Sequence, residues 1–261
     1  MQVPFDGLSS NHVAPPQPFN PLIRTKDHAA GMRNALAVQP AASQWSISVA
    51  KRILDFSVAL ACVLLLATPM LILAFLVRMT SKGPAFFVQK RVGRGGHLFG
   101  VYKFRSMSVG SGSGLGITKL GDSRVTEFGR IMRKFKLDEL PQLFNILRGE
   151  MSLVGPRPKL PRYEPMTDMP YRPGITGAAT LAFRHEEDIL SGVHPSQVDS
   201  FYAKHIMPLK AQIDAEYMNG ATLWSDIRLI AATFFSCLNS SPHSIPFKVE
   251  ERLSVNDSIS A

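Results

Sequence analysis

Two adjacent carboxylates, Asp138 and Glu139, are the residues in this sequence best placed to do chemistry. They follow a run of basic residues and come shortly before Pro141. Proline disfavours helix at the residue before it and suits the first turn of a new helix, so the pair is expected close to a helix N-terminus. Amide groups and the helix dipole attract anions there. The pair can supply a nucleophile together with a metal ligand or base, although a solvated helix cap fits the same residues.

A second candidate for chemistry is the arginine of GEMSLVGPRPKLPRY. Arg157 stands between Pro156 and Pro158, which stiffen the backbone on both sides of it. A rigidly presented guanidinium can form paired hydrogen bonds to a phosphate. An exposed arginine in an ordinary proline-rich loop is the alternative, and the sequence around it does not decide between the two.

An apolar segment from Phe56 to Val77 precedes these candidates and is long enough for a transmembrane helix. Pro69 follows Thr68 near its middle, and an internal proline bends or breaks a helix. Both flanks are basic, which pulls both ends toward the cytoplasm. The pattern fits a re-entrant helix that returns to the face it entered, and it also fits a bent helix that crosses. Asp55, at the mouth of the segment, is expected to pair with a neighbouring base.

The rest of the chain predicts an α+β domain that is mostly helical. PAFFVQKRVGRGG and HLFGVYKFRSM indicate a short β hairpin, and the Gly- and Ser-rich residues 108–122 indicate a mobile loop. Residues 123–136 have a helical pattern with apolar residues on one stripe. Residues 223–238 suit a helix in the bilayer interface, or one packed on the domain core. We expect a disordered polar arm at 1–48, the membrane helix at 49–80, the catalytic domain at 81–240 and a flexible tail at 241–261.

Composition narrows the class of partner without choosing one. The chain has 261 residues, a formal charge of +9 and a pI near 9.8, which favours phosphorylated substrates, nucleic acid or an acidic membrane surface. The start of the chain lacks the pattern of a signal peptide. The two cysteines belong to no CxxC pair, so neither a disulfide framework nor a zinc site is indicated and a reducing compartment is expected. The two common phosphate-cradling glycine motifs are absent.

Read together, these signals resemble one known family. The stretch LGDSRVTEFGRIMRKFKLDELPQLFNILRGEMSLVGPRP closely resembles the bacterial sugar transferases, also called monotopic phosphoglycosyl transferases. Before it, KRILDFSVAL, KGPAFFVQKRVGRGG and YKFRSM are similar to earlier blocks of that family, and RPGITG at 172–177 matches a later one. The resemblance covers roughly residues 50–240.

The resemblance implies roles for particular residues. Asp138 and Glu139 correspond to the family's catalytic dyad, and the Pro-Arg-Pro element at 156–158 to the one associated with the nucleotide end of the donor. In the family the re-entrant helix breaks at a Ser-Pro-like pair. Thr68-Pro69 corresponds to this pair and differs from it in the first residue. Mg²⁺ is the implied cofactor, with Asp138 or Glu139 in its shell. The bases expected to bind phosphate oxygens are Arg91, Lys103, Arg105, Arg133 and Arg157.

The implied function is transfer of a phosphosugar from a UDP-sugar to polyprenol (undecaprenyl) phosphate. Asp138 would form a covalent phosphosugar intermediate and UMP would leave, at the cytoplasmic face of the bacterial inner membrane. This is the first membrane step of exopolysaccharide or related glycoconjugate synthesis, upstream of further glycosyltransferases. A tethered scaffold that binds anionic lipid is the alternative; nucleic acid is not expected, because no nucleic-acid motif accompanies the bases. A homodimer is left open.

One segment departs from the family pattern. After RPGITG many members continue with a block containing Trp or Gln, whereas this chain has AATLAFRHEEDIL. That block is expected to line the sugar pocket, so the sugar is not identified. Larger members of the family carry several membrane helices ahead of the catalytic part. This chain has a polar arm at that place and in this resembles the smaller, single-anchor subgroup.

Overall fold

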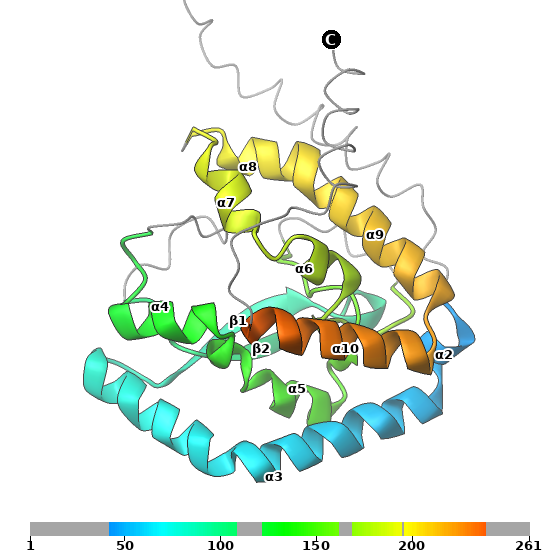
Figure 1. Cartoon of the computed structure of the whole chain (residues 1–261), viewed down its shortest axis with the longest axis horizontal. Coiled ribbons are helices and arrows are strands. Elements are labelled where there is room, and N and C mark those ends of the chain that lie inside the picture. The colour runs from blue at the N-terminus through cyan, green and yellow to red at the C-terminus, as the bar shows by residue number, and fades with distance from the viewer. Residues whose placement is uncertain (1–41, 109–121, 162–168, 195, 239–261) are drawn as a thin grey trace, which may run out of the picture.

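The computed structural model describes residues 42–108, 122–161, 169–194 and 196–238, which form a mixed and mostly helical domain (Figure 1). This confirms the expected composition of helix and strand. The polar arm up to residue 41, most of the loop at 108–122 and the tail from 239 lie outside the described residues. The last residues of the predicted arm are described, and they include the short helix α2 (Gln44–Ile47).

The apolar segment forms one helix, α3 (Val49–Thr80), with Pro69 inside it. At about 1.5 Å per residue, a straight helix of its 32 residues would be about 48 Å long. It is long and apolar enough to cross a membrane by length and composition. The helical backbone is not interrupted at Thr68-Pro69; instead α3 bends in its middle and runs as a broad arch beneath the domain (Figure 1).

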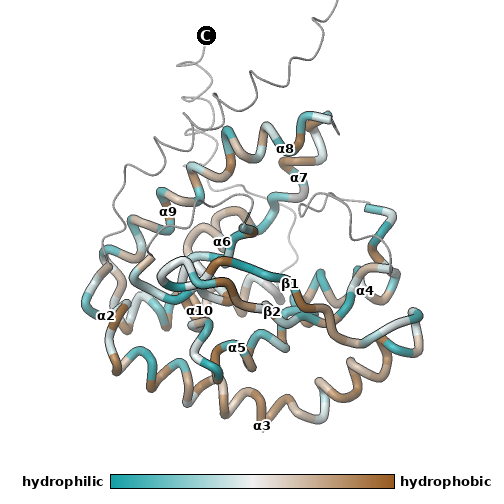
Figure 2. The backbone as a smooth tube through the Cα atoms, turned by 180° about the vertical axis from the view of Figure 1, so that it is seen from behind, coloured by the Kyte–Doolittle hydropathy of each residue, from teal (hydrophilic) through white to brown (hydrophobic). Residues whose placement is uncertain are grey.

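The arch is hydrophobic on two sides, and each side has a different surrounding. One stripe, which includes Ala59, Met70 and Val77, is buried against the domain. The opposite side exposes large apolar side chains along the same length, and Figure 2 shows the hydrophobic stretch that they belong to. They include Leu64, Leu65, Leu71, Ile72 and Phe75. Helices that are apolar all round are typical of a lipid or fully buried surrounding, and here the outer side of the helix is not covered by the residues that the structure describes.

The predicted hairpin is confirmed as β1 (Phe86–Val92) and β2 (Leu98–Phe104), paired antiparallel. Gly95 and Gly96 have positive φ in the turn, where a side chain would be strained. The outer edge of β2 is covered by the side chain of Asn145, which donates to Gly100 O at 2.7 Å and accepts from Tyr102 N at 3.0 Å. This fully buried amide thus fixes the hairpin to the following helical region.

Three short elements follow the hairpin, and the second of them carries both predicted carboxylates. They are α4 (Glu127–Lys134), the 3₁₀ turn η3 (Leu137–Glu139) and α5 (Gln142–Arg148). The helical pattern at 123–136 is confirmed by α4, whose N-cap Thr126 accepts from Gly129 N at 2.9 Å. Gly149, with φ +82°, ends α5 in the left-handed conformation that glycine favours.

The C-terminal half adds a small sheet that the sequence did not predict. Strands β3 (Ser152–Val154) and β4 (Gly174–Thr176) pair in parallel. The helices after them stack above the hairpin, and α10 lies across the front of the domain (Figure 1). In chain order they are α6 (Ala178–Ala182), α7 (Glu186–Ser191), α8 (Val198–Phe201), the π-helical turn η4 (Tyr202–Ile206), α9 (Met207–Gly220) and α10 (Leu223–Leu238).

Of the two alternatives for residues 223–238, packing on the domain core is confirmed for α10, and a position in the bilayer interface stays a prediction. Asp226 and Leu229 are buried on the domain core. Trp224, Phe234 and Phe235 on the same helix are each more than 60% exposed. The helix therefore packs on the domain and also presents an aromatic face outward, as interfacial helices do.

Both ends of α3 are fastened to the same polar domain. Near its start, Arg52 donates to Ile146 O at 2.6 Å and to Leu147 O at 3.2 Å, at the C-terminal end of α5. Asp55 is buried and accepts from Ser152 Oγ at 2.7 Å, with Lys51 Nζ at 3.9 Å, which confirms its structural pairing. Near the end of α3, Val77 packs with Phe104 in a second core cluster. A helix held in this way keeps both ends on one side of the domain.

The junction of α2, α3, α9 and α10 depends on one buried carboxylate. Asp226, 2% exposed, accepts hydrogen bonds from Lys51 Nζ at 2.6 Å, Trp45 Nε1 at 2.9 Å and Tyr217 OH at 2.7 Å. Lys51 is also buried, so this carboxylate compensates its charge in the interior.

Replacing Asp226 by alanine is expected to destabilise the domain by about 3–5 kcal/mol, because Lys51 would keep a buried charge without its strongest partner. Asp188→Ala, at a side chain that is 55% exposed, is the control and should change stability by less than about 0.5 kcal/mol. Unfolding midpoints of the purified proteins in detergent measure both. Equal midpoints for the two variants would contradict the stabilising contribution that we assign to Asp226.

Candidate active site

The local backbone turns sharply just before the carboxylate pair. Lys136 has φ +56° and ψ +21°, and it is the single non-glycine residue with positive φ among those the structure describes. Such a left-handed conformation costs a lysine roughly 1–2 kcal/mol. It ends α4 and starts the turn η3, while Pro141 caps α5 immediately afterwards. Asp138 and Glu139 thus sit at a helix junction, as the sequence predicted, but both are buried rather than solvated.

Glu139 is held between two bases that come from distant parts of the chain. Its Oε1 accepts from Lys103 Nζ at 2.9 Å and also pairs with Arg157 Nη2, while Arg157 Nη1 lies 3.4 Å from Oε2. Burial by itself would raise the pKa of this carboxyl, but the charges of Arg157 and Lys103 outweigh it and hold the pKa well below its ordinary value. Glu139 is therefore a charged anchor for the two bases.

Asp138 has a different surrounding from its neighbour. It is 7% exposed, and its Oδ1 atom is buried without a hydrogen-bond partner among the described residues. Burial, followed by the charge of Glu139, raises the pKa of Asp138, while Lys103, Lys136 and Arg133 act in the opposite direction. Native structures rarely leave such an oxygen without a partner, and such an atom is a common sign of a functional group awaiting a ligand.

The Pro-Arg-Pro element is rigid and faces this pair. Pro156 and Pro158 are buried, while Arg157 extends between them to Glu139. Arg91 supports the element from β1, because its Nη1 donates to Pro158 O at 3.1 Å. The pKa of Arg157 is raised, chiefly by the charge of Glu139. The guanidinium is thus fixed in the charged form at a set position.

The structure brings most of the predicted phosphate-binding bases together, with one exception. Lys103 and Arg157 contact Glu139 directly, Arg133 is near enough to act on the pKa of Asp138, and Arg91 orders the Pro-Arg-Pro element. Arg105 does not join them. Its buried side chain donates through Nη2 to Ser81 O and Ser81 Oγ, both at 2.7 Å, just after the end of α3. The structure thus gives Arg105 a contact with the membrane helix instead of one with the carboxylates.

A second group of side chains lies near Arg157. The sequence pointed to the block that contains most of them but to none of the individual residues. Lys210 forms an ion pair with Glu186 and lies over the rings of Phe183 and Tyr202, at 5.4 Å and 5.5 Å from their centroids. Glu186 also contributes, after Glu139 and Asp138, to the raised pKa of Arg157. The divergent block AATLAFRHEEDIL thus lies within electrostatic range of the site, and its departure from the family pattern was the signal that pointed to it.

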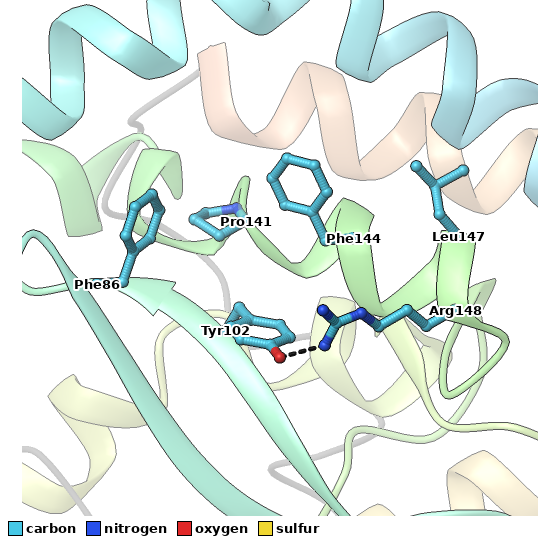
Figure 3. Close-up of a pocket in the computed structure, with 6 residues that line it drawn as sticks. All are labelled: Phe86, Tyr102, Pro141, Phe144, Leu147 and Arg148. Carbon is cyan, nitrogen blue, oxygen red and sulfur yellow. Dashed lines mark hydrogen bonds between the residues drawn. The ribbon is translucent and has the colours of Figure 1, made fainter.

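An apolar hollow begins at Pro141, two residues after Glu139. Pro141, Phe144, Leu147 and Arg148 border it from the α5 region, and Phe86 and Tyr102 from the hairpin (Figure 3). We call it the hairpin pocket. Tyr102 faces this pocket, whereas Lys103, the next residue of β2, contacts Glu139.

The carboxylates of the site can hold a Mg²⁺ ion only if oxygen atoms of a bound substrate complete its coordination. Mg²⁺ prefers oxygen ligands and is commonly held by one or two carboxylates plus phosphate oxygens and waters. Asp138 offers the unpartnered Oδ1, whereas the Oε1 of Glu139 is occupied by Lys103 and Arg157. The described residues contain no cluster of three or more metal-binding side chains. Of the two predicted ligands, Asp138 is the better placed.

The chain is similar to known proteins over most of its length. The profile of the bacterial sugar transferase family matches residues 46–240. A UDP-N-acetylgalactosamine-undecaprenyl-phosphate N-acetylgalactosaminephosphotransferase from Aeromonas hydrophila is 35% identical over 72% of this chain and 43% of its own length. A UDP-glucose:undecaprenyl-phosphate glucose-1-phosphate transferase from Xanthomonas campestris pv. campestris is 38% identical over 71% of this chain and 38% of its own length.

A relative from Caulobacter vibrioides is matched over more of its own length. It is also a UDP-glucose:undecaprenyl-phosphate glucose-1-phosphate transferase, and it is 35% identical over 75% of this chain and 72% of itself. The match thus spans about two fifths of the first two relatives and most of the third. In all three the similarity covers most of this chain. The chain therefore belongs to the bacterial sugar transferase family.

Proposed function

We propose that this protein transfers a phosphosugar from a UDP-sugar to a polyprenol phosphate, with Asp138 as the nucleophile. The observation that carries the proposal is the contrast within the dyad. Glu139 is bound by two cations, while the buried Oδ1 of Asp138 is without a partner among the described residues. The names of the relatives support a UDP-sugar donor and undecaprenyl phosphate as the acceptor.

In the first step, an oxygen of Asp138 attacks the phosphorus that carries the sugar. The bond from that phosphorus to the bridging oxygen breaks, UMP leaves with the bond's electron pair, and the phosphosugar stays on the carboxylate. Arg157 and Lys103 are positioned by Glu139 so that their remaining N–H groups face developing negative charge. Phosphoryl transfer depends mainly on such positioning and charge stabilisation.

In the second step, a phosphate oxygen of the polyprenol phosphate attacks the same phosphorus. The bond to the Asp138 oxygen breaks, which regenerates the carboxylate and leaves a polyprenol diphosphosugar. A bound Mg²⁺ ion would offset negative charge on the diphosphate. In this proposal Asp138 Oδ1 is its protein ligand, and Glu139 keeps the bases in place instead of binding the metal.

The fold supports placing this chemistry at a membrane surface. We infer that α3 enters the bilayer as a re-entrant arch, because both of its ends are fastened to one polar domain. A helix that crossed would have to separate those ends by about 30 Å of hydrocarbon. The exposed apolar side of the arch then faces lipid, and the basic flanks lie at the cytoplasmic face of the inner membrane.

A tethered scaffold that only binds anionic lipid is the competing function. A scaffold would need the basic residues and the apolar helix. It gives no reason for Asp138, a buried carboxylate near several bases whose pKa is nevertheless raised. The proposed enzyme would supply lipid-linked sugar to downstream glycosyltransferases of exopolysaccharide or related glycoconjugate synthesis.

The substitution Asp138→Asn is expected to lower UMP release from UDP-sugars by about a thousandfold or more, because the amide keeps the shape and lacks the nucleophilic charge. The measurement is UMP release by purified protein in membrane vesicles, against a panel of UDP-sugars. Glu216→Gln, at an exposed carboxylate on α9 outside the divergent block, is the matched control. Turnover of Asp138→Asn at the wild-type rate would refute the nucleophile.

The first step should also depend on pH in a defined direction. Asp138 must be ionised to attack, so the rate should fall on acidification; its pKa is raised in the metal-free site, and a bound Mg²⁺ ion would act in the opposite direction. Lys103 lowers this pKa, so Lys103→Met should move the midpoint to higher pH. Lys134→Met removes a base of α4 that lies over the Phe135 ring, 5.6 Å from its centroid, and should move the midpoint less than Lys103→Met. An unmoved midpoint in Lys103→Met would contradict the assignment of Asp138 as the titrating group.

A further inference from the structure

The hairpin pocket has a volume of about 470 Å³ and two walls. One wall is a face of α5, where Phe144 and Leu147 are three residues apart and so lie on the same side of the helix, next to Pro141. The other wall is the hairpin, through Phe86 and Tyr102. Figure 3 shows these side chains around a common space, and α3 runs along the upper edge of the view.

The chemistry of the lining suits an apolar chain and not a sugar or nucleotide. Four of its six residues are aromatic or proline, one is leucine, and no carboxylate or amide is among them. Its single charged member is Arg148, which donates to Tyr102 OH and lies over that ring, 5.0 Å from its centroid. The pocket thus has no fixed group that would pair with several hydroxyls, and it has aromatic faces for hydrocarbon.

The lining of the pocket adjoins both the turn that carries the dyad and the helix α3. At one end, Pro141 follows that turn after a single residue, Leu140. At the other end, Leu147 packs against the buried cluster around Ala59 of α3. Phe86 and Phe144 are 46% and 40% exposed, so the pocket is open. A chain that began at the dyad and followed this wall would arrive at the apolar side of α3.

From this arrangement we propose that the hairpin pocket binds the first isoprene units of the polyprenol phosphate acceptor. The inference rests on the proposed function and assigns it an acceptor subsite. The phosphate head would be at Asp138, the adjoining isoprene units would lie between Phe144 and Tyr102, and the rest of the chain would continue into the bilayer. An apolar occupant would also cover Phe86 and Phe144, which are otherwise open to water.

The two steps of the reaction separate this subsite from the catalytic group. Formation of the phosphosugar adduct needs only the UDP-sugar, whereas its discharge needs the acceptor. Phe144→Ser is the test variant, because its exposed side chain can be removed without opening the core. We expect UMP release in a single turnover without acceptor to stay within twofold of wild type. The KM for polyprenol phosphate should rise at least tenfold, both with a ten-carbon prenyl phosphate in detergent and with the full-length acceptor in vesicles.

Val88→Ser is the matched control, since Val88 lies on the same hairpin, is 52% exposed and does not line the pocket. It should leave both steps unchanged. An equal rise in acceptor KM for Val88→Ser would point to general membrane affinity and overturn the subsite. An unchanged KM in Phe144→Ser, or a rise seen only with the full-length acceptor, would also overturn it.

A milder variant guards against a folding defect. Phe144→Leu keeps the pocket apolar and should raise the acceptor KM by a smaller factor, with normal adduct formation. If adduct formation failed equally in both Phe144 variants, the residue would be structural and the subsite would be rejected. Loss of the proposed function itself has a different signature, namely activity that survives Asp138→Asn.

Discussion

The ion cluster of Lys103, Glu139 and Arg157 is the interaction on which the rest of the site depends. Burying one carboxylate next to another is unfavourable unless cations compensate. Glu139 takes both nearby cations and stays ionised, which leaves Asp138 buried, less compensated and without a partner at Oδ1 among the described residues. Two neighbouring residues of the same chemical type thus acquire different roles. Glu139 holds the bases in place, and the proposed function assigns Asp138 to the substrate.

The same cluster joins segments that the fold must bring from far apart. Lys103 comes from β2, Glu139 from η3 and Arg157 from the loop after β3. A chain of contacts connects β2 to β3 through two helices: Asn145 fixes β2 to α5, Arg52 fixes α5 to α3, and Asp55 fixes α3 to Ser152 in β3. The apolar helix is therefore part of the scaffold of the site as well as the proposed contact with lipid. In this account the geometry of the site and attachment to a membrane depend on the same elements.

Local patterns in the sequence predicted the elements that depend on local rules. The apolar run, the hairpin glycines, the stripe of α4 and the proline after the dyad each have a short-range physical cause, and the structure has all four. The parallel pair β3–β4 was missed because each strand has only three residues and their partners lie about twenty positions apart. Arg105 was grouped with the phosphate-binding bases because its type and position resembled theirs. Its contact with Ser81 depends on how α3 meets β2, which no local pattern encodes.

The central claim is that the Asp138 carboxylate carries the phosphosugar between the two substrates. Its most direct test is intact-mass and peptide mass spectrometry of the protein after incubation with a UDP-sugar and Mg²⁺, with no acceptor present. The account predicts a mass increase of one sugar phosphate, located on Asp138 and lost when polyprenol phosphate is added. An unmodified protein that nevertheless turns over both substrates, or an adduct on another residue, would contradict it.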